Sequence, residues 1–124
     1  LNPAAARLSD GRVMVYGSMG GDGQPQTQAT IFTRYAVQGV PLQESVNRPR
    51  WLLGRTWGQT SDSLKLEGRF TPETVTHLQA LGHEVEMFPD FSEAMGHAGA
   101  IVRHPDGLFE GAFDPRSNGT AAGF

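Results

Sequence analysis

The chain has 124 residues and a formal net charge of −3 at pH 7, with 38% hydrophobic and 19% charged residues. This composition is ordinary for one globular unit, and its weakly acidic balance argues against nucleic acid or an anionic membrane surface as a partner. The chain has no cysteine, which excludes disulfides, thiolate metal sites and a cysteine nucleophile. No apolar run approaches the ~20 residues of a membrane span.

The first third of the chain predicts a strand, a glycine-rich loop and a helix. A turn at residues 9–11 precedes residues 13–16, whose β-branched and aromatic side chains are typical of a buried strand. Helical spacing begins at Pro25, since proline is tolerated in a first turn, and Gly39 ends it. The apolar residues expected on its buried face are Ala29, Ile31, Phe32, Tyr35 and Ala36.

The middle of the chain predicts a short helix, an irregular connection and a strand. The helix starts at Pro41, carries Leu42 and Val46, and has to end by Pro49. Residues 51–63 mix two tryptophans with glycine and polar residues, so we predict an irregular connection there. Residues 64–67 alternate as a half-buried strand does.

The last third predicts a helix, a strand and a hairpin. Thr71 is a good N-cap for a helix that starts at Pro72 and ends before Gly82, its expected C′ residue. This helix is expected to bury Val75, Leu78 and Leu81. A strand is expected at residues 84–87, and hairpin arms at 100–103 and 108–112 around a type I turn. Hairpins with interspersed helices predict an α+β fold with a mostly antiparallel sheet.

The glycine-rich loop is the most informative segment. Four glycines, at positions 17, 20, 21 and 23, lie between the predicted strand and helix. Glycine lets a ligand approach backbone N–H groups, so such a loop suits a phosphate or the oxyanion of an acyl-transfer reaction. The loop lacks the Lys and Ser/Thr of a P-loop and the G-x-G-x-x-G spacing of a dinucleotide site. The adjacent amides of Gly20 and Gly21 satisfy the oxyanion requirement, with a simple chain-reversing turn as the alternative.

Other candidate groups have both a functional and a structural interpretation. The four histidines lack the short spacing of a zinc site, so we expect no metal, and His97 stands out because small residues flank it. Asp114 and Arg116 would either bind a substrate carboxylate or form an Asp-capped turn with a structural arginine. Trp51 and Trp57 would stack on a ligand or close the edge of the core. No Ser-His-Asp arrangement is evident.

Residues 17–26, Gly-Ser-Met-Gly-Gly-Asp-Gly-Gln-Pro-Gln, resemble the G-S-x-G-G segment of the γ-glutamyltranspeptidase family, especially its G-G-D-x-Q-P-Q branch. The resemblance continues in the same order over nearly the whole chain, at residues 47–50, 66–68, 82–85, 95–98 and 114–116. It implies an N-terminal-nucleophile hydrolase with an αββα sandwich, cleaved from a precursor into a large and a small subunit. A threonine at the new N-terminus attacks a γ-glutamyl amide in that family, no cofactor is required, and the oxyanion-hole glycines fall on Gly20 and Gly21.

The family's threonine, its substrate-binding Ser-Ser pair and its charged substrate-binding residues have no counterpart in these 124 residues. We therefore expect residues 1–124 to be one unit, the C-terminal portion of a small subunit, inactive alone. Its expected partners are the rest of that subunit, the large subunit and a γ-glutamyl small molecule such as glutathione. Uncovered apolar surface would favour self-association. The compartment is not fixed.

Two alternatives remain at this point. The first is an acylase of the same fold that acts on another amide, such as a cephalosporin side chain or poly-γ-glutamate. The second is a non-catalytic binding or assembly module. The residues that select a substrate in this family lie mostly upstream of the glycine pair, so the sequence does not separate these alternatives.

Overall fold

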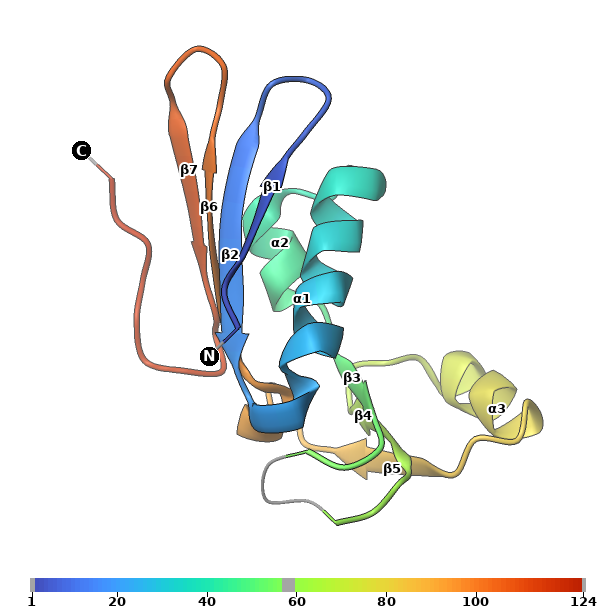
Figure 1. Cartoon of the computed structure of the whole chain (residues 1–124). Helices are drawn as coiled ribbons and strands as arrows, with labels where there is room; N and C mark the ends of the chain where they lie inside the picture. The colour runs from blue at the N-terminus through green and yellow to red at the C-terminus, as the bar shows by residue number, and fades with distance from the viewer. Residues whose placement is uncertain (1, 57–59, 124) are drawn as a thin grey trace.

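A four-stranded antiparallel sheet, in the order β1-β2-β6-β7, is the frame of the molecule (Figure 1). The structure is a computed structural model that describes residues 2–56 and 60–123. The strands are β1 (Ala4–Arg7), β2 (Val13–Met19), β6 (His97–Arg103) and β7 (Phe109–Phe113). β2 and β6 pair along their whole length, from Val13 opposite Arg103 to Met19 opposite His97. The predicted hairpin is therefore confirmed as β6 and β7, with a longer first arm.

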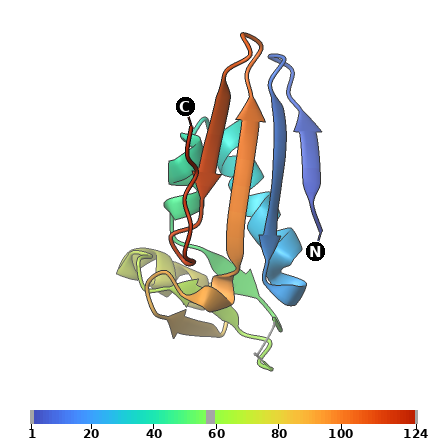
Figure 2. The ribbon, with the colours of Figure 1, turned by 90° about the vertical axis from the view of Figure 1, so that its left-hand side faces the viewer.

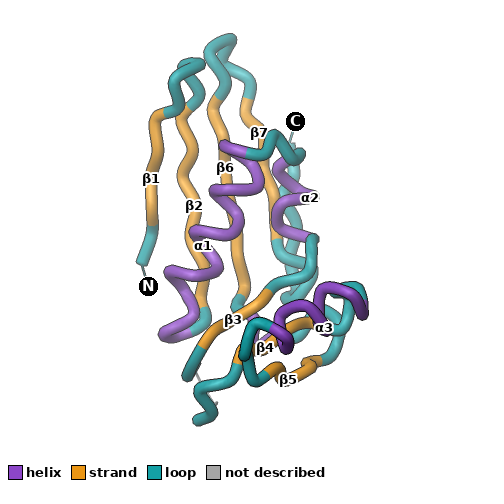
Figure 3. Tube along the Cα trace, turned by 90° about the vertical axis from the view of Figure 1, so that its right-hand side faces the viewer, coloured by secondary structure: helices purple, strands orange, loops and turns teal. Residues whose placement is uncertain are grey.

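Two helices cover one face of this sheet, as Figure 3 shows. They are α1 (Gln24–Phe32), which continues as a π-helical turn over Thr33–Val37, and α2 (Leu42–Asn47). The core between them consists of Met14, Ile31, Tyr35, Leu42, Val46, Ala98, Ala100, Val102 and Ala112. The expectation that Ala29 is buried in this core is wrong, because Ala29 is exposed. Successive helical residues are rotated by about 100°, so Ile31 and Tyr35 face the sheet and Ala29 faces away from it.

A second, smaller sheet, with the order β3-β4-β5, lies at the end of the large sheet where α1 begins (Figure 1). Its elements are β3 (Trp51–Leu53), β4 (Leu64–Glu67) and β5 (Val85–Phe88), and α3 (Pro72–Ala80) connects the last two. β3 is antiparallel to β4, whereas β4 and β5 are parallel. Four of the five strand pairings in the molecule are antiparallel, so the predicted α+β class with mostly antiparallel strands is confirmed.

The small sheet corrects three expectations. Residues 51–53 form a strand rather than part of an irregular connection, and β4 is buried at all four positions instead of half-buried. β4 is the central strand, and its polar side chains have buried partners of their own. No residue of α3 is buried, and Leu81 is 65% exposed. The helix packs mainly on the edge strand β5, although its predicted Thr71 cap is present, with Thr74 N donating to Oγ1 at 3.3 Å.

The face of the large sheet opposite the helices stays largely open (Figure 2). Its outward side chains include Val15, Ile101 and Phe109, which are 49%, 50% and 66% exposed. The C-terminal segment runs across part of this face and touches it where Gly119 meets the ring of Phe113. Within the described residues, the large sheet therefore has a helical layer on one side only. None of their helices is long and apolar enough to cross a membrane.

Candidate active site

The predicted glycine loop is a tight turn between β2 and α1. β2 extends to Met19, so three of the loop residues belong to the strand, and a short 3-10 turn over Gly21–Gly23 leads into α1. Gly20 and Gly21 have φ angles of 138° and 55°. Residues with a Cβ rarely adopt such angles, so the chain can reverse here without strain only because both positions are glycine.

Hydrogen bonds to the preceding carbonyls orient the two glycine amides. The carbonyl of Gly20 accepts bonds from Gly23 N at 3.0 Å and from Thr56 Oγ1 at 3.1 Å. The carbonyl of Met19 accepts a bond from Ser18 Oγ at 2.6 Å. In a trans peptide the N–H points opposite to the carbonyl of the preceding residue. The amides of Gly20 and Gly21 therefore point away from these donors, and the bonds of the described turns and caps include none donated by either amide.

A third glycine, Gly96, supports the turn from the position directly before β6. A Cβ on Gly20 would lie 3.0 Å from Gly96 Cα, and a Cβ on Gly96 would lie 2.3 Å from the carbonyl oxygen of Met19. The φ angle of Gly96 is 79°. The two backbones are thus in direct contact. Gly96 lies in the family-like segment at residues 95–98, but nothing in its local sequence indicates that it touches Gly20.

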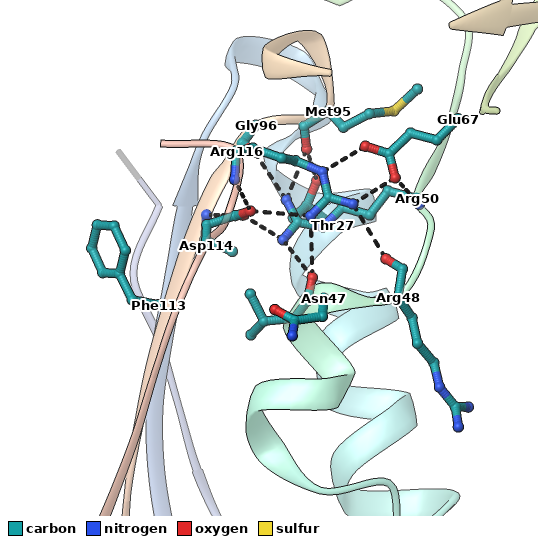
Figure 4. Close-up of polar contacts among 12 residues, drawn as sticks. Thr27, Asn47, Arg48, Arg50, Glu67, Met95, Gly96, Phe113, Asp114 and Arg116 are labelled. Carbon is teal, nitrogen blue, oxygen red and sulfur yellow. Dashed lines mark hydrogen bonds and ion pairs between the residues drawn. The ribbon is translucent and has the colours of Figure 1, made fainter. Parts of the chain in front are cut away.

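Four charged side chains form a buried ionic cluster beside this turn: Arg50, Glu67, Asp114 and Arg116 (Figure 4). Arg116 holds Glu67 through two bonds, Nε to Oε1 at 2.6 Å and Nη2 to Oε2 at 2.5 Å. It also donates Nη1 to Asp114 Oδ1 at 3.0 Å, and Asp114 pairs with Arg50. All four residues are at most 4% exposed. Bidentate pairing of this kind is what makes burial of several charges tolerable.

The cluster binds the backbone of residues 95–98, the segment that contacts the glycine turn. Arg50 Nη1 donates to the carbonyls of Met95 at 3.1 Å and Gly96 at 2.9 Å, and Asp114 Oδ2 accepts a bond from Ala98 N at 2.7 Å. Burial opposes ionisation of Asp114, but Arg50 and the two amides that bind the carboxylate lower its pKa below the ordinary value. Burial lowers the pKa of Arg50 to about 10, so Arg50 stays a cation at neutral pH.

These contacts favour the structural interpretation of Asp114 and Arg116. The Nε, Nη1 and Nη2 atoms of Arg116 all donate hydrogen bonds to protein oxygens, including the carbonyls of Val46 and Arg48. A side chain so enclosed has no donor left for a substrate carboxylate. The remaining members, Arg50 and Glu67, were not singled out from the sequence, because the partners of each lie far along the chain.

His97, the histidine singled out from the sequence, begins β6 opposite Met19 on the open face of the sheet. Its Nε2 is buried and finds no hydrogen-bond partner within the described part of the chain. His77 and His83 are exposed. No group of three or more His, Asp or Glu among residues 2–56 and 60–123 could hold a metal ion. Trp51 lies on an edge strand and is 36% exposed, while Trp57 lies outside the described residues.

Comparison with known proteins places these features in a family. The sequence model of the gamma-glutamyltranspeptidase family matches residues 2–124. Over all 124 residues the chain is 80% identical to the oxamate amidohydrolase proenzyme of Klebsiella pneumoniae, of which it spans 24%. Over 110 residues, or 89% of the chain, it is 44% identical to the glutathione hydrolase-like YwrD proenzyme of Bacillus subtilis, of which it spans 21%.

The fold is shared with a solved structure as well. The transpeptidase CapD of Bacillus anthracis superposes with a TM-score of 0.82 at 24% identity, over 99% of this chain and 70% of that chain. The similarity confirms the expected N-terminal-nucleophile hydrolase fold. The chain spans only 18–24% of the curated relatives that it matches, so it is part of a larger precursor.

Proposed function

The chain belongs to the gamma-glutamyltranspeptidase family, and on that premise we propose that it supplies the oxyanion-binding turn of an amide-hydrolysing enzyme. In this proposal the nucleophile lies in the rest of the precursor and attacks the amide carbonyl carbon. The carbonyl oxygen then gains negative charge, and the N–H groups of Gly20 and Gly21 donate hydrogen bonds to it. Donors already in place stabilise that charge without a cost of reorganisation.

The orientation of the two glycine amides carries this proposal. Both preceding carbonyls are occupied, that of Met19 by Ser18 and that of Gly20 by Thr56 and Gly23. The amides themselves are therefore turned the other way, at the junction of a strand and a helix. The N-terminus of α1 follows directly, and its dipole adds to the local preference for negative charge. A turn whose only task is to reverse the chain needs none of these contacts.

For the substrate we propose a small amide such as oxamate. The relative named as an oxamate amidohydrolase is 80% identical over the entire chain, whereas the relative named as glutathione hydrolase-like is 44% identical. Hydrolysis of the C–N bond of oxamate by water yields oxalate and ammonia. A γ-glutamyl amide is the second candidate, supported by the family and by the 44% identical relative.

The proposal is tested in the complete precursor with Gly21→Val. Valine at a φ of 55° would displace the turn, and loss of one oxyanion donor lowers kcat by about 10²–10³. Ammonia release from oxamate and cleavage of glutathione are measured per mole of matured small subunit, which separates catalysis from failed processing.

Gly107→Val is the matched control, because Gly107 has a φ of 92° in a remote hairpin turn, and a Cβ added there would meet nothing within 4 Å. It is expected to keep the wild-type kcat. Equal kcat values for Gly21→Val and the wild type would overturn the oxyanion role. Faster cleavage of glutathione than of oxamate would move the substrate to the second candidate.

A further inference from the structure

We propose that Lys65 is a positioning residue for the oxyanion turn, acting through residues 54–56, which follow β3; the inference rests on the proposed function. Lys65 is the chain's only lysine, and its side chain is 0% exposed. It occupies the middle of β4, where it pairs with Glu86 of β5. Burying an ammonium group is unfavourable unless it is fully hydrogen-bonded, so the contacts of Nζ indicate what the residue does.

The ammonium group of Lys65 holds both ends of the β3–β4 connection. Nζ donates to the carbonyls of Gly54 at 3.0 Å, Ser61 at 2.9 Å and Ser63 at 3.3 Å, and it lies 3.1 Å from Ser63 Oγ. The amide of Gly54 also bonds to the carbonyl of Ser63 at 3.1 Å. Among the described residues of this connection, 54–56 and 60–63, a backbone bond and the Lys65 cation thus join its two ends.

Glu86 reinforces the same closure from the adjacent strand. Its Oε2 accepts bonds from Ser63 Oγ at 2.8 Å and from Ser61 Oγ at 3.0 Å. These two hydrogen bonds, with the charge of Lys65 adding to them, lower the pKa of Glu86. Lys65, the two serines and Glu86 therefore form a continuous polar chain. Nζ has no carboxylate within ion-pair distance among the described residues, so the backbone carbonyls are its main acceptors.

Residues 54–56 reach the turn through Thr56, two residues after Gly54. Thr56 is 5% exposed, and its Oγ1 donates to the carbonyl of Gly20 at 3.1 Å. A Cβ on Gly23 would lie 3.1 Å from Thr56 Oγ1, so Thr56 packs directly against the turn. The bond from Lys65 fixes the position of Gly54, and the position of Gly54 determines that of Thr56, two residues later. The bond from Thr56 to the Gly20 carbonyl then fixes the peptide plane that contains the Gly21 amide. Because Nζ is enclosed, Lys65 positions the turn and does not touch substrate.

The test is a double-mutant cycle in the complete precursor, with Lys65→Met, Thr56→Val, the double variant and Val102→Ala. Lys65→Met removes the cation at similar volume, and small displacements of catalytic groups cost up to about 10²-fold in rate. We expect each single variant to lower kcat about 10-fold or more with KM little changed. The double variant should resemble Thr56→Val, because Lys65 acts on the Gly20 carbonyl only through the Thr56 bond. Effects that multiply, or an unchanged kcat in Lys65→Met, would overturn the proposal.

Val102→Ala controls for lost stability, since Val102 is fully buried in the core of β6, away from this segment. It should lower Tm and leave kcat unchanged. Hydrogen exchange at the Gly23 amide, which donates to the Gly20 carbonyl at 3.0 Å, gives a readout independent of turnover. Exchange there should accelerate in Lys65→Met and Thr56→Val but not in Val102→Ala, and equal exchange in all four proteins would refute the role of Lys65. If the wild type hydrolyses no amide, the proposed function fails. The hydrogen-exchange comparison then tests by itself whether Lys65 positions the turn.

Discussion

At the scale of single residues, the site depends on glycines that meet backbone to backbone. Gly20 and Gly21 were identified from their sequence motif, but the contact of Gly20 with Gly96 joins positions that are far apart in sequence. No local pattern predicts such a contact, because it arises from the pairing of β2 with β6. The same is true of Thr56, which reaches Gly20 from a segment whose sequence appears irregular.

Gly96→Ala should therefore damage the turn from its supporting side. The added Cβ would lie 2.3 Å from the carbonyl oxygen of Met19 at a φ of 79°, and a strained backbone of this kind costs about 1–3 kcal/mol. We expect a lower Tm and a lower kcat in the complete protein. Gly99→Ala, on β6 three residues later, is the control, because the nearest non-neighbouring atom to a Cβ at Gly99 is Ala112 O at 3.8 Å. Equal kcat values for the two variants would contradict the support assigned to Gly96.

The buried ionic cluster makes a pH-dependent contribution to stability. The pKa of Asp114 is lower in the folded chain than in the unfolded one. Its stabilisation is therefore present above the unfolded pKa of about 3.9 and is lost as pH falls through the folded pKa. Asp114→Asn leaves Arg50 and Arg116 without their carboxylate, and breaking a buried pair costs about 3–5 kcal/mol. Calorimetry of the complete protein should show a large Tm deficit for Asp114→Asn at pH 7, and a smaller one near pH 3.

Asp106→Asn is the control for that comparison, since Asp106 lies in an exposed hairpin turn where its Oδ1 caps Leu108 N. Its Tm should follow that of the wild type at both pH values. A Tm deficit of Asp114→Asn that stays constant from pH 7 to pH 3 would mean that the charge of Asp114 contributes nothing.

At the scale of elements, local chemistry predicted the helices better than the strands. The caps and prolines of α2 and α3 were identified because they act within one turn of their helix. β1 was missed since its Ala-Ala-Ala-Arg sequence has little strand preference of its own and becomes a strand by pairing with β2. β4 was expected to be half-buried because its Lys65 and Glu67 look like solvent-facing residues. Their burial depends on partners such as Arg116 and Ser61, which sequence alternation does not reveal.

At the scale of the whole molecule, the open face of the large sheet sets the behaviour of the separated chain. The outward side chains of Val15, Ile101 and Phe109 are about half to two-thirds exposed, which is unusual for apolar groups on a regular sheet. The edge strands β1 and β7 also have one unpaired side each. Because the chain spans 18–24% of its relatives, we expect the rest of the precursor to supply the cover for this face.

The purified 124-residue chain should therefore self-associate in sedimentation experiments and release no ammonia from oxamate, since its proposed nucleophile is supplied elsewhere. Burial of apolar area drives the association at ~25 cal/mol per Å², so a charge in the middle of the face should disperse it. Ile101→Lys tests this, because Ile101 lies on β6 between two paired strands and is 50% exposed. Arg103→Lys is the control for a substitution on β6 that leaves the charge of the strand unchanged, because Arg103 is an exposed position two residues from Ile101. A monomeric wild-type chain at micromolar concentration would show that this face needs no partner, and turnover by that chain would show that its nucleophile lies within these residues.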